Sequence, residues 1–220
     1  QVGNQLSGSH DVTILADDFT EINTTVSGLE GRGLMASTRG NATVYVKGGS
    51  ISTTGGVSGG SAPIGILTEV LGTSPSGKGA AVITINATSV STLGTNAYGV
   101  LAYSSSSSNS FEKSEIDINN SIIRTAGIGA TGLFTSIGKA TNTSDSSIAV
   151  HGTSIVETSG ASSHGISASS QSGLAKVSVD EGAQVLTHGA NSHAVVATSN
   201  QAAGGVLITN AGTIVSDQNN

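Results

Sequence analysis

Cysteine is absent from this chain of 220 residues, and proline, aromatic residues and charged residues are scarce. No disulfide can staple the fold, and a domain of this size can bury enough core without one. Charged residues make up 10%, the formal net charge is −6, and the lysines and arginines form no cluster. That distribution argues against nucleic acid as a partner, and an aromatic content of 3% leaves no platform for stacking bases.

Long apolar runs are missing as well. No stretch approaches the roughly 20 residues of a membrane-spanning helix, and the first residues lack the pattern of a secretion signal. We therefore expect that the chain begins after a removed segment or is a fragment of a longer protein. Glycine is abundant, with 31 residues, beside many serines, threonines, valines and isoleucines. β-Branched residues interspersed with glycine and serine predict short strands and turns rather than disorder.

A glycine followed by an apolar residue recurs along the chain at steps of 29–34 residues. The last copy is degenerate; the pairs are Gly33-Leu34, Gly65-Ile66, Gly99-Val100, Gly132-Leu133, Gly165-Ile166 and Ala194-Val195. Upstream of each pair come another glycine and, in most copies, a single apolar residue. Earlier still comes an apolar-x-apolar pair such as Ile116/Ile118. A small residue or threonine stands two positions after each Gly-apolar pair, as Ala168 does.

Each repeat therefore predicts three short strands separated by turns. Units of about 30 residues must stack on one another to bury their apolar faces. We predict an all-β fold, a parallel β-helix (β-solenoid) with three strands per coil and about seven coils of 29–34 residues. Isoleucine and valine ladders should line two sheets, and alanine and threonine the third. Residues 1–220 should form a single domain, with protruding loops near 56–63, 104–114 and 138–147.

Two stretches resemble catalytic or cofactor motifs. GIGATG, Gly127 to Gly132, matches the dinucleotide fingerprint, but its glycines are repeat positions and strand rather than helix should follow. In TSGASSHGIS, serines surround His164 as they would around a nucleophile and its base, but no acid lies in this turn. The motif returns one coil later as GANSHA around His193, which a unique active site would not need. We predict no catalytic residue here.

His164 and His193 occupy equivalent positions in adjacent coils, so stacking should bring their rings together. Two histidines do not complete a zinc site, and we predict neither a metal ion nor a cofactor. Two nearby imidazoles resist joint protonation, which predicts a modest pH effect. Carboxylates gather around Asp17 and around Glu112, Glu115 and Asp117, without the arginines of a polysaccharide-acting site.

Four stretches carry a resemblance to a known family: VYVKGGSISTTG, ITINATSVSTLG, IAVHGTSIVETSGASSHGISASS and VLITNAGTIVSD. They resemble the passenger domains of bacterial autotransporters, the type V secretion proteins, and the resemblance spans Val12 to Ser216. It implies a right-handed β-helix that reaches the cell surface, or is secreted, through the outer membrane. Export would use a C-terminal β-barrel that is not part of these 220 residues. Passengers of this family commonly act in adhesion, self-aggregation or contact with host cells.

The functional hypothesis is thus an adhesin-like virulence protein. Its partner would be a host cell-surface or matrix protein or glycan, or a sister molecule. The predicted binding residues are Arg32, Tyr98, His164 and His193 in one column, together with Phe111 in the loop from Ser104 to Phe111. Two alternatives stay open: an inert stem that displays a domain outside this fragment, and a polysaccharide-acting β-helix enzyme.

Overall fold

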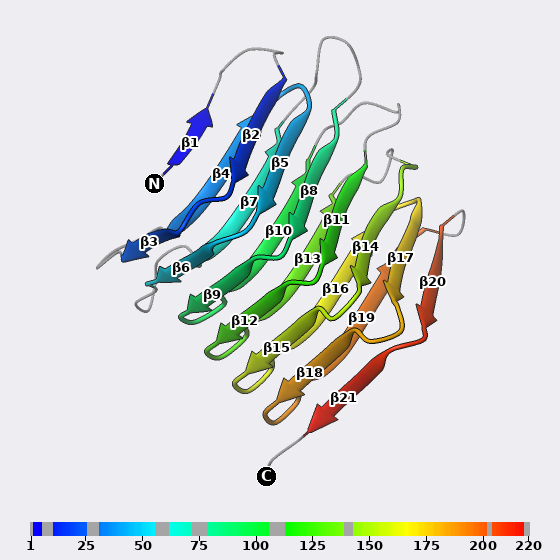
Figure 1. Cartoon of the computed structure of the whole chain (residues 1–220). Helices are drawn as coiled ribbons and strands as arrows, with labels where there is room; N and C mark the ends of the chain where they lie inside the picture. Colours follow the sequence, from blue (N-terminus) through cyan, green and yellow to red (C-terminus); the bar gives the residue numbers. More distant parts are fainter. Residues whose placement is uncertain are drawn as a thin grey trace.

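The computed structural model describes 21 β-strands and no helix. It describes residues 2–5, 11–25, 31–55, 62–71, 79–105, 113–138, 143–201 and 204–217. The strands follow one another in a repeating cycle of three, and each member of the cycle belongs to a different sheet. Figure 1 shows the resulting stack of coils, with the two ends of the chain at opposite ends of the stack.

Three sheets of seven parallel strands run along the stack. The first sheet contains β1 (Val2–Gln5), β4 (Arg32–Thr38), β7 (Ile64–Val70), β10 (Tyr98–Ser104), β13 (Thr131–Ile137), β16 (His164–Ser170) and β19 (His193–Ser199). The second contains β2 (Val12–Asp17), β5 (Ala42–Lys47), β8 (Ala81–Asn86), β11 (Ser114–Asn119), β14 (Ser146–His151), β17 (Leu174–Val179) and β20 (Gly205–Asn210). The third contains β3 (Glu21–Thr25), β6 (Ser50–Thr54), β9 (Ser89–Leu93), β12 (Ile122–Ala126), β15 (Ile155–Ser159), β18 (Gln184–His188) and β21 (Thr213–Asp217).

The predicted parallel β-solenoid with three strands per coil is therefore confirmed. Its register follows the sequence repeat, because Leu34, Ile66, Val100, Leu133 and Ile166 pair in succession along the first sheet. Each of the five coils from β4 to β18 has a neighbouring coil on both sides, so the regular part of the solenoid has about five turns. That number is slightly below the seven coils predicted, because the first and last coils have a neighbour on one side only. The right-handed sense stays a prediction.

Alternation along each strand builds the core. On β11 the burial pattern is strictly alternating, with Ile116 and Ile118 fully inside and Glu115 and Asp117 outside. Ile83 and Ile148 stack on Ile116 from the two adjacent coils. Because the same positions repeat in every coil, the apolar side chains form continuous ladders with almost no exposed surface. The first sheet has the predicted inner ladder of alanine and threonine, for example Ala102 beside Thr68, and next to it a second, apolar inner ladder that includes Ile66.

The glycine of each Gly-apolar pair is required by a close approach. A Cβ on Gly132 would lie 2.6 Å from the carbonyl oxygen of Gly165 and 2.6 Å from Cγ1 of Val156. Neither distance is possible for real atoms, and the first obstacle is backbone that cannot move aside. The first sheet therefore packs directly on the third through a column of bare backbone.

The predicted loops fall mainly on residues 56–61, 106–112 and 139–142, which lie outside the described residues. Several residues at the ends of the predicted ranges belong to strands rather than to loops. Ser104 ends β10 and is fully buried, and Ser146 begins β14 at the far side of the third loop.

Candidate functional site

Four of the predicted binding residues lie in one row on the outside of the first sheet. The register pairs Arg32 with Ile64, Ile64 with Tyr98, and Tyr98 with Thr131. It continues from Thr131 through His164 to His193. We call these six residues the first-sheet row. The sequence placed its members in one column correctly, whereas their role in binding stays a prediction. Phe111, the fifth predicted residue, lies outside the described residues.

An apolar cluster accompanies the N-terminal half of the first-sheet row. Met35, Ile64 and Leu67 are buried and form a cluster separate from the core, with Tyr98 and Leu101 packed against it. Nη1 of Arg32 lies 2.9 Å from Sδ of Met35. The ring of Tyr98 also contacts Phe134, with ring centroids 5.5 Å apart. Burial raises the pKa of Tyr98, so its hydroxyl stays neutral. Contact area at this end of the row comes from the partly exposed Tyr98, Leu101 and Phe134, which lie over the buried aliphatic side chains.

At the other end of the row two imidazole rings lie side by side. The rings of His164 and His193 have centroids 5.2 Å apart and planes inclined by 50°. Partial burial, and then the neighbouring His193, lower the pKa of His164. Nδ1 of His164 has no hydrogen-bond partner among the described residues. The predicted resistance to joint protonation agrees with this direction.

The serines beside His164 are turn residues. Ser162 has a positive φ of 58°. Ser163 is buried, and its hydroxyl donates to the carbonyl oxygen of Gly127 one coil earlier, at 3.1 Å. Its N–H donates to the hydroxyl of Ser192 in the next coil. Both groups of Ser163 therefore connect coils, and nothing in the described contacts activates a serine as a nucleophile.

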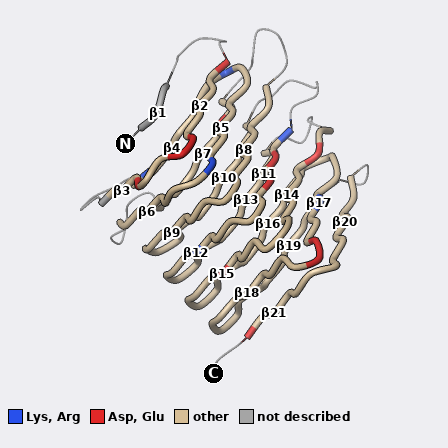
Figure 2. Tube along the Cα trace, in the orientation of Figure 1, with Lys and Arg blue, Asp and Glu red and all other residues tan. Residues whose placement is uncertain are grey.

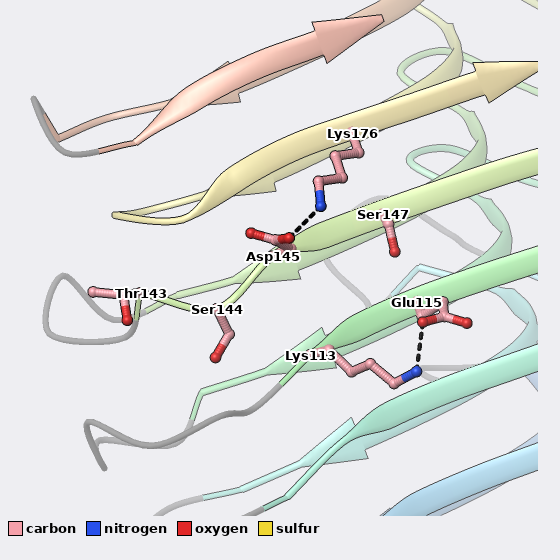
Figure 3. A pocket seen from close by; sticks show the side chains of 7 residues that line it. All are labelled: Lys113, Glu115, Thr143, Ser144, Asp145, Ser147 and Lys176. Carbon is pink, nitrogen blue, oxygen red and sulfur yellow. Dashed lines mark hydrogen bonds and ion pairs between the residues drawn. The ribbon is translucent and has the colours of Figure 1, made fainter. Parts of the chain in front are cut away.

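A second candidate site is a groove on the outer face of the second sheet, and Figure 3 shows the larger of its two depressions at close range. Two adjoining depressions of about 490 and 280 Å³ share Glu115, Ser147 and Lys176. The register arranges the lining in two rows that cross four strands. One row is Glu115, Ser147, Lys176 and Leu207, and the other is Asp117, Ala149, Ser178 and Thr209. We call this feature the second-sheet groove.

The groove exists because small side chains lie between long ones. Ser147 and Ala149 on β14 form the floor, and side chains of β11 and β17 rise on either side. Lys113 and Glu115 form an ion pair at 2.6 Å on one wall. Lys176 pairs with Asp145 at the other, and Asp145 also accepts the N–H of Leu174 at 3.1 Å (Figure 3).

His151 lies in the next position along β14, between two carboxylates. Its Nδ1 is 2.6 Å from Oδ2 of Asp180, and its Nε2 is 3.7 Å from Oδ1 of Asp117, which lines the groove. Ser178 donates to the other oxygen of Asp180 at 3.1 Å. The hydrogen bonds from His151 and Ser178 lower the pKa of Asp180 and keep it ionised.

His188 repeats this arrangement on the third sheet. Its Nε2 is 3.7 Å from Oε1 of Glu157 in the preceding coil, and its Nδ1 is 3.7 Å from Oδ2 of Asp217 in the next. Glu157 also accepts from Nε of Arg124 at 2.9 Å. In the described ranges, no group of three or more histidine, aspartate and glutamate side chains could hold a metal ion.

The sequence interpretation found Glu115 and Asp117 but missed the groove. Its lining comes from four coils, and its floor is defined by small side chains, which carry no motif. One signal was present: the outward residues between the ladder positions read E-D, S-A, K-S and L-T in successive coils. Charged residues are few along the coils (Figure 2), and besides this groove they also gather where Lys47 meets Asp17 and Asp18.

Within the described part of the chain, no helix is long and apolar enough to cross a membrane. Comparisons with protein-family models, with curated proteins and with solved structures found no match for this chain.

Proposed function

We propose that this chain is part of an adhesin-like passenger of the autotransporter class, exposed on a bacterial surface or secreted. It binds a host cell-surface or matrix protein or glycan, or a sister molecule. Two observations support this proposal: the sequence resemblance and the three-sheet solenoid. A rigid solenoid displays its outward side chains in straight rows, so recognition can use a long face rather than a single pocket.

The observation that carries the proposal is the first-sheet row with its apolar cluster. An aromatic pair, buried aliphatic side chains and an arginine lie together on an outer face rather than in the core. Tyrosine and arginine are enriched among residues that dominate binding energy at protein interfaces. A chain with so few aromatic residues places two of them in contact at this one location.

The test uses the 220-residue chain and measures its binding to host cells and to matrix proteins. Tyr98→Ser should weaken binding by about tenfold or more, as the loss of a central interface tyrosine does. Tyr45→Ser is the matched control, because Tyr45 is a half-buried outward tyrosine on the second sheet. Equal losses for both variants, or none for Tyr98→Ser, would contradict the assignment to the first-sheet row.

The inert stem is separated by the same assay, because a stem would leave the isolated chain unable to bind at all. We propose no catalytic activity for the chain. In the described contacts Ser163 is engaged with backbone of adjacent coils, and His151 and His188 pair with carboxylates rather than with a nucleophile.

A further inference from the structure

We infer that the second-sheet groove is a binding site for an uncharged oligosaccharide, lying along β14. This inference goes beyond the proposed function, because the groove is on a different sheet from the first-sheet row and needs no host surface. The groove offers two partly exposed walls and a floor with no large side chain. Its walls stand on β11 and β17, two strand spacings or about 9.6 Å apart, which leaves room for one narrow chain.

The lining matches the hydrogen-bonding needs of a polyol. A hydroxyl group both donates and accepts, so a site that offers acceptors and donors together can satisfy a sugar ring. Glu115 and Asp117 supply carboxylate acceptors along one wall, and the ammonium group of Lys176 is a donor on the opposite wall. Ser147 adds a hydroxyl on the floor, Ser178 adds one on the β17 wall, and Ala149 gives a small apolar surface for the C–H face of a ring.

Two other classes of ligand fit less well. An extended peptide gains its affinity on a sheet from free backbone groups at an edge. β14 lies between β11 and β17, and its backbone is already paired on both sides. An acidic ligand would meet Glu115, Asp117 and Asp145, while both lysines of the groove are already paired with carboxylates.

Charge complementarity therefore favours a neutral chain of hydroxyl groups. Asp117 is the residue of greatest interest on the acidic wall. Its side chain is 42% exposed, and its contact with Nε2 of His151 measures 3.7 Å, too long for a hydrogen bond. It can therefore accept hydroxyl donors without first giving up a close ion pair, in contrast to Glu115, which Lys113 contacts at 2.6 Å.

The experiment screens the 220-residue chain against an array of neutral oligosaccharides, glucosamine oligomers and heparin fragments. Titration calorimetry at millimolar ligand concentration then measures affinity. We expect a neutral oligosaccharide to bind and heparin fragments to fail. Asp117→Asn removes charge but keeps shape, and it should weaken binding by roughly tenfold, the effect of losing one charge-assisted hydrogen bond. Ala149→Phe fills the floor and should abolish binding.

The matched control is Ser52→Phe, which adds the same bulk at a half-buried outward position of the third sheet. Its binding should equal that of the unchanged chain. Thermal unfolding of each variant shows whether the coils remain intact, and Glu115→Gln offers a second, milder change on the same wall. The inference is overturned if no neutral oligosaccharide binds, if only heparin or glucosamine oligomers bind, or if Ala149→Phe and Ser52→Phe behave alike.

Discussion

The strands of the third sheet carry two buried ladders that differ in chemistry. One is apolar: Ile51, Val90, Ile123, Val156 and Val185. The other stands two residues further along the same strands and consists of threonines: Thr53, Thr92, Thr125, Thr158 and Thr187. Both are 3% exposed or less. Burial therefore removes apolar surface from water in the isoleucine and valine ladder, whereas in the threonine ladder it also encloses a row of hydroxyl groups.

The threonine hydroxyls have no hydrogen-bond partner among the described residues. Successive strands lie about 4.8 Å apart, which is too far for one hydroxyl to bond the next. The methyl groups explain why threonine is nonetheless suited to this place. Cγ2 of Thr158 would lie 3.4 Å from a Cβ on Gly132, beside Cγ1 of Val156 at 2.6 Å. Both ladders thus pack on the glycine column of the first sheet.

The largest loss of stability should come from a change that disturbs both ladders at once. Gly132→Ala places a methyl group against the Gly165 carbonyl and Val156, and we expect it to lower the free energy of unfolding by about 4 kcal/mol. Urea unfolding followed by circular dichroism measures the change. Gly205→Ala is the control, because its Cβ would meet only Cδ2 of Leu174, a side-chain end that can move. Similar losses for the two variants would show that close packing is not the cause.

The next largest effect should come from placing a threonine in the apolar ladder. Ile123→Thr removes apolar volume at a fully buried position and adds a hydroxyl without a partner. We expect a loss of about 2–3 kcal/mol in the free energy of unfolding, from the cavity and the buried polar group together. Ile123→Val, which shortens the side chain without adding polarity, should cost only about 1 kcal/mol. A threonine variant as stable as the valine variant would mean that the hydroxyl finds a partner.

The reverse change should have the opposite sign. Thr125 is only 3% exposed, and its hydroxyl has no hydrogen-bond partner among the described residues. Thr125→Val keeps the shape of the side chain and removes that hydroxyl. We expect the free energy of unfolding to rise by about 1 kcal/mol, because a buried unpaired hydroxyl is destabilising. Thr54→Val, at an exposed position of the same sheet, should change stability by less than about 0.5 kcal/mol. Destabilisation by Thr125→Val would contradict the account of the second ladder.

Sequence periodicity predicted the apolar ladder more readily than the threonine ladder, for a physical reason. Isoleucine and valine at fixed spacing are typical of an inward position, whereas threonine occurs at both inward and outward positions of these strands. Thr53 and Thr54 are neighbours, yet the first is buried and the second exposed. Alternation from Ile51 places Thr53 inward, but the reason why a threonine suits that position is its contact with the glycine column, which joins residues from different sheets.

The same limit applies to the candidate sites. The first-sheet row could be predicted because its residues stand immediately before the Gly-apolar pairs, so register alone aligns Tyr98 with His164 and His193. The second-sheet groove depends on side-chain size across four coils, with Ala149 in the floor between Asp117 and Ser178. A small side chain is not a sequence motif, so the floor of the groove could not be predicted. The carboxylate partners of His151 also lie about one coil away on either side, too far along the sequence to form a local pattern.

The first-sheet row is a third ladder, which lies on the outer face. Changes in it should affect stability less than changes in the two buried ladders. Partial burial and His193 lower the pKa of His164 from the ordinary value of 6.5. As the pH falls, His164 is protonated in the unfolded chain before it is protonated in the folded chain. The folded state therefore keeps its full stability above pH 6.5 and loses part of it as the pH falls below that value. Thermal unfolding between about pH 7.5 and pH 5.5 should therefore show a smaller loss on acidification in His164→Gln than in the unchanged chain. If His164→Gln loses as much stability on acidification as the unchanged chain, the paired imidazoles of the first-sheet row are not the source of the effect.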